Sequence, residues 1–185
     1  MIRSVTVYCS SSNLAPEPYF SEAELLGCGL AERKIDVVFG GGNVGLMGRT
    51  ADAALKAGGT VKGIIPRFLE EREVAHSGLT ELHVVETMHQ RKMLLTDWAD
   101  AFVILPGGLG TLDELMEILT WKHLGQHRKP IILLNTEGFW DQLLQFFERI
   151  AADRMVKPGY ENYYEVCNSA SDVLALIDSM NTSCS

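Results

Sequence analysis

The sequence predicts an α/β fold in which a mainly parallel sheet carries helices on both faces. Short apolar runs alternate with stretches of helical periodicity along the whole chain, which is the pattern of repeated β-then-α units. The apolar runs are also continuous, as expected for strands that are covered on both faces. The 185 residues suit a single domain, which we expect to span residues 1–185.

Strands and helices are expected in turn along the chain. The expected strands are the apolar runs at residues 5–9, 37–39, 61–65, 82–85, 101–105 and 131–134, with a short one near Val166. The expected helices lie at residues 19–33, 46–57, 89–99, 111–124, 139–154 and 172–180. The longest irregular stretch is residues 66–80. Its charged run at residues 70–73 is typical of a solvated surface, although a loop of this length can also serve as a lid or binding loop.

Composition narrows the function before any motif is considered. A net charge of −8 argues against sequence-independent binding of nucleic acid, which depends on clustered lysine and arginine. A small phosphate ligand stays possible, because backbone N–H groups bind phosphate without net positive charge. The first ten residues lack a signal-peptide pattern, and no apolar run approaches the ~20 residues that span a bilayer. We therefore expect no membrane partner.

The four cysteines are far apart and form no C-x-x-C pair; they are Cys9, Cys28, Cys167 and Cys184. This spacing favours neither disulfides nor a zinc site and fits a reducing compartment, so we expect a cytoplasmic protein. Cys9 is a conceivable nucleophile, but a buried structural thiol is the commoner state of such a residue.

Two glycine-rich turns follow expected strands. Residues 40–48 have the sequence G-G-G-N-V-G-L-M-G, and residues 106–111 have the sequence P-G-G-L-G-T. Open α/β sheets bind ligands at the carboxyl ends of their strands, and a helix that begins there offers free N–H groups to an anion. A single turn of this kind is explained as well by a tight bend. Two of them in one small domain favour a phosphate or nucleotide site.

The same turns exclude several cofactor-dependent functions. Neither is followed by Gly-Lys-Ser/Thr, and neither matches G-x-G-x-x-G with an acidic residue at the end of the next strand. ATP hydrolysis and hydride transfer are therefore not indicated, and we expect no cofactor. We expect no metal either, because His123 and His127, although four residues apart, have no further ligands near them.

Residues 111–114, T-L-D-E, have two explanations. They match a capping box, in which Thr111 and Glu114 would each satisfy a backbone N–H at the start of a helix. Alternatively, Glu114 stands one turn into a helix whose N-terminus holds phosphate or ribose. Asp113 and Glu117 are four residues apart, a mildly repulsive spacing that capping alone does not explain. The spacing leaves both explanations open.

Arg91 and Lys92 stand near the start of another expected helix, where the helix dipole disfavours positive charge. A bound anion would relieve that cost. Arg91 can also make bidentate contact with a phosphate or a carboxylate, including that of Glu114. The alternative is a pair of solvated side chains, which is the commoner state of an isolated Arg-Lys pair.

Together these motifs resemble those of the LONELY GUY family, the cytokinin riboside 5′-monophosphate phosphoribohydrolases. The family pattern P-G-G-x-G-T-x-x-E is complete at residues 106–114, and the pattern M-H-x-R-K is complete at residues 88–92. The segment G-G-G-x-x-G-L-M-G at residues 40–48 and C-S-S-S at residues 9–12 add to the likeness. It covers nearly the whole chain and is looser at residues 14–18 and 169–185.

The resemblance implies a Rossmann-like, doubly wound fold and a homodimer with long helices packed at the interface. It implies a purine nucleoside 5′-monophosphate as the substrate, with free base and ribose 5-phosphate as the products. Arg91 and Glu114 match the catalytic pair. We expect substrate contacts at Glu73, Met88, Lys92, Gly107, Gly108, Leu109, Gly110, Thr111, Leu112, Asp113 and Thr120.

Cleavage of an N-glycosidic bond passes through an oxocarbenium-like state, so a nearby carboxylate is its natural stabiliser. We expect Glu114 either to align water as a general base or to hold the ribose hydroxyls. Arg91 would orient Glu114 and steady charge on the leaving base or the phosphate, which residues 107–111 would cradle. The ribose and base side of the crevice is expected to be shaped by Ser10, Gly41, Gly42 and Gly45.

Two rival functions stay open. A non-catalytic nucleotide-binding carrier or sensor would use the same glycine loops, but it does not need Arg91 and Glu114. A hydrolase of another nucleotide, such as a pyrimidine monophosphate, would share every motif. The older label of lysine decarboxylase, which many relatives carry, gains no support, because pyridoxal phosphate needs a Schiff-base lysine with partners that tune its ring.

Overall fold

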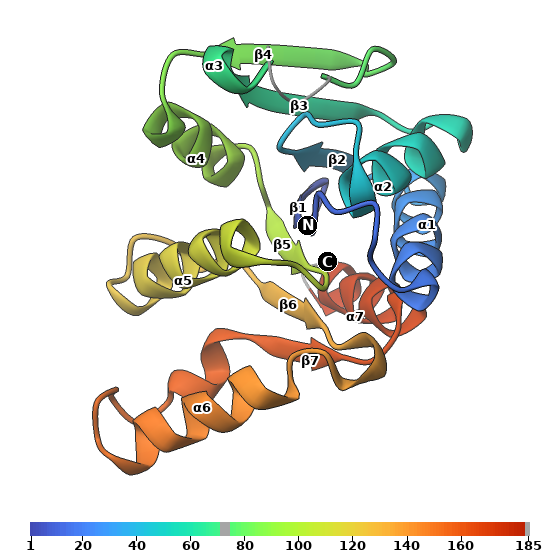
Figure 1. Cartoon of the computed structure of the whole chain (residues 1–185). Coiled ribbons are helices and arrows are strands. Elements are labelled where there is room, and N and C mark those ends of the chain that lie inside the picture. Colours follow the sequence, from blue (N-terminus) through green and yellow to red (C-terminus); the bar gives the residue numbers. More distant parts are fainter. Residues whose placement is uncertain (71–74, 184–185) are drawn as a thin grey trace.

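The computed structural model describes residues 1–70 and 75–183, and a seven-stranded sheet lies at the centre of this part of the chain (Figure 1). The strands run in the order β4-β3-β2-β1-β5-β6-β7, and each neighbouring pair is parallel. Their bounds are β1 Ser4–Tyr8, β2 Asp36–Phe39, β3 Val61–Pro66, β4 Glu81–Val85, β5 Ala101–Ile104, β6 Ile131–Leu134 and β7 Glu165–Cys167. The order reverses between β1 and β5, which is where open α/β sheets bind ligands.

Helices cover both faces of the sheet (Figure 1). One face carries α1 Glu17–Glu32, α2 Gly45–Lys56 and α7 Ala170–Ser183, and the other carries α4 Met88–Asp97, α5 Leu109–His123 and α6 Asp141–Ala152. Two short 3-10 helices, η1 Thr136–Gly138 and η2 Tyr160–Tyr163, flank α6. The expected doubly wound fold is confirmed. Among the described residues, no helix combines the length and apolarity that crossing a bilayer requires.

Burial on both faces explains the continuous apolar runs of the sequence. In β5, Phe102 and Ile104 join the apolar cluster under α4, α5 and α6, whereas Val103 joins the cluster under α1, α2 and α7. Thr6 in β1 is a polar residue that lies fully buried in this interior. Its hydroxyl donates to the carbonyl of Leu95 in α4 at 2.7 Å, so the buried polar group is satisfied.

The stretch at residues 66–80 is not irregular throughout, contrary to the expectation. β3 continues to Pro66, and α3 Arg67–Glu70 follows at once as a single helical turn. The backbone N–H of His76 then donates to the carbonyl of Gly41 at 3.0 Å. The part of this stretch at His76 is therefore held to the glycine-rich loop that follows β2.

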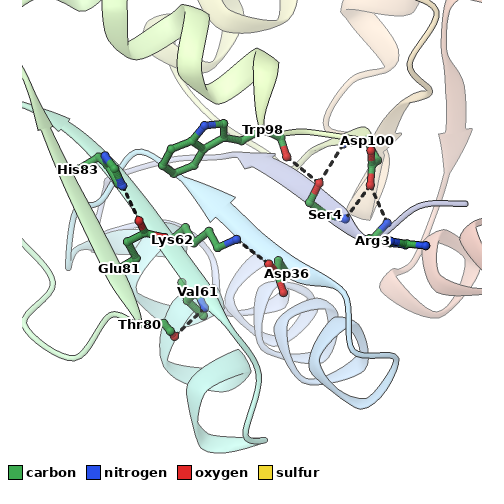
Figure 2. A network of polar contacts seen from close by, with 10 residues as sticks. All are labelled: Arg3, Ser4, Asp36, Val61, Lys62, Thr80, Glu81, His83, Trp98 and Asp100. Atoms are coloured by element: carbon green, nitrogen blue, oxygen red, sulfur yellow. Dashed lines mark hydrogen bonds and ion pairs between the residues drawn. The ribbon is translucent and has the colours of Figure 1, made fainter.

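A polar network holds the amino edge of the sheet, opposite the edge where ligands are expected (Figure 2). Asp100 lies just before β5, and its carboxylate accepts from the backbone N–H of Ser4 in β1 at 3.2 Å. The Ser4 hydroxyl donates to the carbonyl of Trp98 at the end of α4 at 2.6 Å. An ion pair of 2.8 Å between Lys62 and Asp36 joins β3 to β2. These contacts join the amino end of β1 to the segment between α4 and β5, and the amino end of β2 to that of β3.

The contact between α1 and α2 leaves no room for a side chain at Gly27. A Cβ atom there would lie 2.3 Å from the carbonyl oxygen of Thr50, which belongs to the backbone of α2. Alanine is normally favoured over glycine inside a helix by roughly 1 kcal/mol. We nevertheless expect Gly27→Ala to lower the free energy of unfolding by about 1–3 kcal/mol, because α2 must move.

Urea denaturation measures this loss. Gly29→Ala is the matched control on the same helix, because a Cβ atom there would meet the flexible end of the Leu174 side chain at 2.2 Å. We expect a smaller loss for this control, and equal losses in the two variants would contradict the packing argument.

Candidate active site

A cavity of about 380 Å³ opens at the carboxyl edge of the sheet, between the ends of β1 and β5. Its walls come from the loop after β1, the first turn of α2 and the N-terminal parts of α4 and α5. The lining residues are Cys9, Ser10, Ser11, Ser12, Met47, Met88, Arg91, Gly108, Leu109, Gly110, Thr111, Asp113 and Glu114. The cavity therefore occupies the point at which the strand order reverses.

Hydrogen bonds join the loops that surround this cavity. The N–H of Ser10 donates to the carbonyl of Pro106 at 3.1 Å, which links the loop after β1 to the turn after β5. The carbonyl of Ser10 accepts from the N–H of Leu46 at 2.9 Å, and the side-chain oxygen of Asn13 accepts from the N–H of Gly45 at 2.8 Å. Two N–H groups at the start of α2 are therefore satisfied within the protein.

The N-terminus of α5 is different, because no side chain of the described residues caps it. Gly108 is the N-cap, in an extended conformation, and the helix begins at Leu109. The N–H groups of a first helical turn have no partner within the helix. Here that turn, with Gly110 and Thr111, lines the cavity. Together with the helix dipole, it makes this wall of the cavity a binding surface for an anion.

Of the two explanations for residues 111–114, the capping box is wrong. α5 begins two residues earlier, because Gly108 already supplies the extended N-cap conformation and the next residues form the first turn. Thr111 is buried within that turn. The capping box lies instead at the start of α4. There Gln90 donates its backbone N–H to the Thr87 hydroxyl at 3.1 Å and accepts the Thr87 N–H at 3.2 Å.

This cap places Arg91 one turn into α4, with its side chain buried against the loop after β2. Its Nη2 donates to the carbonyl of Gly40 at 3.3 Å, and its Nη1 approaches the sulfur of Met88 at 3.8 Å. The solvated alternative is therefore wrong for Arg91. Among the ion pairs of the described residues, none joins Arg91 to Glu114, so the two charges influence each other through space without a direct salt bridge.

Glu114 faces the cavity from α5 and titrates near neutrality. Burial raises its pKa from 4.5 to about 7. The positive charge of Arg91 opposes the rise most strongly, and Lys92 opposes it less, whereas Asp113 and Glu117 add to it. A carboxyl group with this pKa exchanges its proton readily at physiological pH, as a general acid or base must.

Lys92 accounts for the crowding of acids on α5. Its ammonium lies 2.7 Å from a carboxylate oxygen of Asp113 and 3.5 Å from one of Glu117. The Lys92 side chain is only 16% exposed, so the solvated alternative is wrong here as well. One cation thus offsets the repulsion between two carboxylates that are four residues apart on one helix.

Cys9 lines the cavity as a buried free thiol, which confirms the expectation for this residue. Burial, with a smaller contribution from the charge of Glu114, raises the pKa of the thiol well above its usual range. Because the thiolate is the nucleophilic form, Cys9 is not suited to attack a substrate.

The cavity gathers most, but not all, of the residues expected in the site. Those that line it are Ser10, Met88, Arg91, Gly108, Leu109, Gly110, Thr111, Asp113 and Glu114. Those outside its lining are Gly41, Gly42, Gly45, Lys92, Gly107, Leu112 and Thr120. Glu73 lies outside the residues that the structure describes. Ser11, Ser12 and Met47 line the cavity without having been singled out, although each belongs to a motif segment of the sequence.

Leu112 and Thr120 occupy other faces of α5. Leu112 packs against the apolar cluster under α4, α5 and α6. Thr120 is exposed, donates its hydroxyl to the carbonyl of Met116 at 2.7 Å, and borders a second hollow of about 290 Å³. The substrate contact that the resemblance implies for Thr120 therefore has no counterpart in the cavity of a single chain.

The two histidines near the end of α5 do not form a pair. α5 ends at His123, and the Nε2 atom of His127 lies 2.9 Å from the carbonyl oxygen of Ile118. In the part of the chain that the structure describes, no group of three or more His, Cys, Asp or Glu residues is placed to hold a metal ion.

Solved structures with the same fold include two proteins linked to the molybdenum cofactor. The molybdenum cofactor carrier protein from Chlamydomonas reinhardtii has a TM-score of 0.76 at 20% identity, covering 98% of this chain and 99% of that chain. The molybdenum cofactor binding protein from Rippkaea orientalis has a TM-score of 0.74 at 22% identity, covering 97% and 98%. Identities this low show a shared fold and nothing about the ligand.

Sequence comparisons are more specific. A family model described as "Possible lysine decarboxylase" matches residues 47–177. The cytokinin riboside 5′-monophosphate phosphoribohydrolase of Rhodococcoides fascians is 46% identical over 178 residues, which are 96% of this chain and 90% of the relative. An Arabidopsis thaliana protein of the same description is 44% identical over 157 residues, covering 84% and 72%. Matches of this extent show that the chain belongs to the LONELY GUY family of cytokinin riboside 5′-monophosphate phosphoribohydrolases.

Proposed function

We propose that this chain hydrolyses the N-glycosidic bond of a purine nucleoside 5′-monophosphate of the cytokinin type and releases free base and ribose 5-phosphate. One observation carries the proposal. Glu114, a partly buried carboxyl whose pKa is raised to about 7, lines the same cavity as the uncapped N-terminus of α5. The descriptions of relatives that match over most of the chain support the same reaction.

The first turn of α5 is the proposed site of the 5′-phosphate. The corresponding N–H groups of α2 already donate to Ser10 and Asn13, whereas those of α5 border the cavity without a side-chain cap from the described residues. A phosphate in this position gains main-chain hydrogen bonds and the helix dipole. It also anchors the nucleotide at a distance from the reacting bond, which positions that bond for attack.

We assign Glu114 the role of general base toward the attacking water. The water oxygen bonds to C1′ of the ribose, Glu114 accepts the water proton, and the bond from C1′ to the base nitrogen breaks with its electron pair leaving on the base. The ionised carboxylate also stabilises the positive charge that develops on the sugar. The alternative role, holding the ribose hydroxyls, does not call for a pKa near 7.

Arg91 complements this chemistry. Its guanidinium lines the cavity, and none of the ion pairs within the described ranges neutralises it. Negative charge grows on the departing base while the phosphate is already anionic. A buried cation without a carboxylate partner stabilises both, and more strongly than it would in water.

A nucleotide carrier or sensor is the weaker candidate. Retention of a phosphate requires the free N–H groups of α5, but an ionised Glu114 beside them repels an anionic ligand. A binding protein gains nothing from this arrangement, whereas a hydrolase uses it.

The proposed assembly is a homodimer. The hollow beside Thr120 is lined mostly by apolar side chains of α5, α6 and residues 155–164, and Met155 in its wall is 75% exposed. Exposed apolar surface of this kind is typical of protein interfaces. In the proposed dimer a second copy covers this face, and Thr120 of one chain serves the substrate of the other.

The proposed location is the cytoplasm, and the proposed unit is one nucleotide-binding domain of residues 1–185. Cys9, Cys28 and Cys167 are free thiols, a state that a reducing compartment maintains.

Turnover tests the reaction directly. Purified protein is incubated with AMP, isopentenyladenosine monophosphate, GMP and CMP, and free base is followed by chromatography. We expect base release from the purine substrates. Below about pH 7, kcat/KM should fall by about tenfold per pH unit, because Glu114 gains a proton and can no longer act as a base. Glu114→Gln should lower kcat by about 10²- to 10⁴-fold.

Full turnover by Glu114→Gln would refute the role of this residue. Binding of AMP without base release from any substrate would favour the carrier, and release from CMP alone would move the substrate class to pyrimidines.

The geometry at the start of α5 predicts that alanine is tolerated at Gly110 but not at Gly107. A Cβ atom at Gly107 would lie 2.1 Å from Oγ1 of Thr111, whereas one at Gly110 would meet no described atom within 4 Å. Gly107→Ala must displace the first turn of α5, so we expect it to lower the melting temperature and to raise KM by about tenfold or more. Gly110→Ala should keep the melting temperature or raise it, since alanine favours the helix. Equal melting temperatures in both variants would contradict the tight packing of Gly107 against Thr111.

The homodimer predicts a mass of twice 20.5 kDa by light scattering. Met155→Glu places a charge on the proposed interface and should shift the mass to that of a single chain. Leu25→Glu, at an exposed position on α1 in the opposite helical layer, is the control and should leave the dimer intact. A wild-type mass of one chain would exclude the dimer.

A further inference from the structure

Glu117 is a charged residue beside the proposed catalytic centre that has no assigned role. It follows Glu114 by about one turn of α5, yet it does not line the cavity. Its side chain is 24% exposed, and its carboxylate lies 3.5 Å from the ammonium of Lys92. The carboxylate thus stands behind the cavity wall, where it acts on the site through its charge.

Lys92 connects this carboxylate to the site. Its largely buried ammonium lies between Asp113 at 2.7 Å and Glu117 at 3.5 Å, and so ties α4 to α5. Glu114 stands between these two acids in the sequence, but in the described structure no ion pair joins it to Lys92. The flanking carboxylates therefore hold the cation, and Glu114 is left without a salt bridge.

We propose that Glu117 is a positioning residue of the active site, which with Asp113 holds the Lys92 ammonium away from Glu114 and thereby leaves Glu114 free to accept a proton from water. This inference rests on the proposed function of Glu114 and extends it to a residue outside the cavity.

Titratable and charged groups face Glu114 from three parts of the fold, and they are Arg91, Lys92, Asp113, Glu117, Tyr8 and Cys9. The two cations favour the ionised carboxylate, and the two acids disfavour it. Burial raises the pKa of the Tyr8 hydroxyl and of the Cys9 thiol well above their usual ranges, so both stay protonated and neutral at pH 7. The charge balance at Glu114 is therefore set by the two cations and the two acids.

Loss of the Glu117 charge has two effects on Glu114, and both lower the pKa of its carboxyl group. It removes a negative charge close to Glu114. It also removes one of the two carboxylates that hold Lys92, so that the ammonium is freer to approach the site. Both changes favour the ionised form of Glu114 and lower its affinity for a proton. A carboxylate of lower proton affinity is a weaker base toward water.

Direct titration tests the proposal. Protein labelled with ¹³C at the glutamate carboxyls is followed by NMR between about pH 4 and pH 9, and the Glu114 signal is assigned by its absence in Glu114→Gln. We expect Glu117→Gln to lower the pKa of Glu114 by about half a unit or more. The acid limb of kcat/KM should move to lower pH by the same amount.

Two further variants make the result specific. Lys92→Met should raise the pKa of Glu114, and the double variant Lys92→Met/Glu117→Gln should lie between the two single variants. Glu24→Gln is the matched control, because it removes a carboxylate that pairs with Arg49 at 3.2 Å in the opposite helical layer. It should leave the titration of Glu114 unchanged.

An unchanged or raised pKa of Glu114 in Glu117→Gln would overturn the proposal, even if the variant melts at a lower temperature. The reaction itself is judged separately. If no substrate is hydrolysed but the pKa of Glu114 shifts as expected, the positioning role stands and the proposed reaction fails.

Discussion

The backbone of Ser10 is the junction on which the geometry of the site depends. Its N–H donates to the turn after β5, and its carbonyl accepts from the first turn of α2. Each such hydrogen bond stabilises the fold by only about 1 kcal/mol net, but a buried group left unpaired costs about 1–3 kcal/mol, so the loops have little freedom to part. The hydrogen bond from the N–H of Leu46 to the carbonyl of Ser10 occupies a donor of α2. The first turn of α5, in contrast, stays open to the cavity. Two similar glycine-rich turns thus differ in which N–H groups they leave free at the cavity.

Burial has the largest effect on the pKa of Glu114. The guanidinium of Arg91 opposes the rise in the pKa of Glu114, but burial outweighs it because no direct salt bridge forms between them. The folded protein therefore binds the Glu114 proton more tightly than the unfolded chain. The stability that this adds is fully present below about pH 4.5 and is lost as the pH rises through about 7. An ionised Glu114 is thus held in the site at a cost to the fold.

Much of the fold could be predicted from the sequence, because burial of each strand on both faces leaves a continuous apolar run between amphipathic helices. The sequence pattern puts the start of α5 two residues too late, because local capping patterns do not reveal that Gly108 serves as the N-cap. The burial of Arg91 and the pairing of Lys92 were beyond local patterns, since their partners Gly40 and Asp113 lie far away in the chain and meet them only in the folded sheet. The position of the cavity at the carboxyl ends of the strands could be predicted from the sequence, but the balance of charges around Glu114 could not.

The fold alone does not separate catalysis from carriage, because proteins that carry the molybdenum cofactor share it. A carrier and a hydrolase differ in the charged groups that each needs in its cavity. A carrier of an anionic ligand is improved by every cation and N–H group in its cavity and weakened by every carboxylate. A glycoside-type hydrolase must instead favour a state in which the sugar becomes positive for a moment, and only interactions stronger in that state than in the bound substrate accelerate the reaction. A partly buried carboxylate beside an uncapped helix N-terminus opposes ground-state binding of an anion and favours that transient charge. Glu114 is therefore better explained by the transition state than by the ligand.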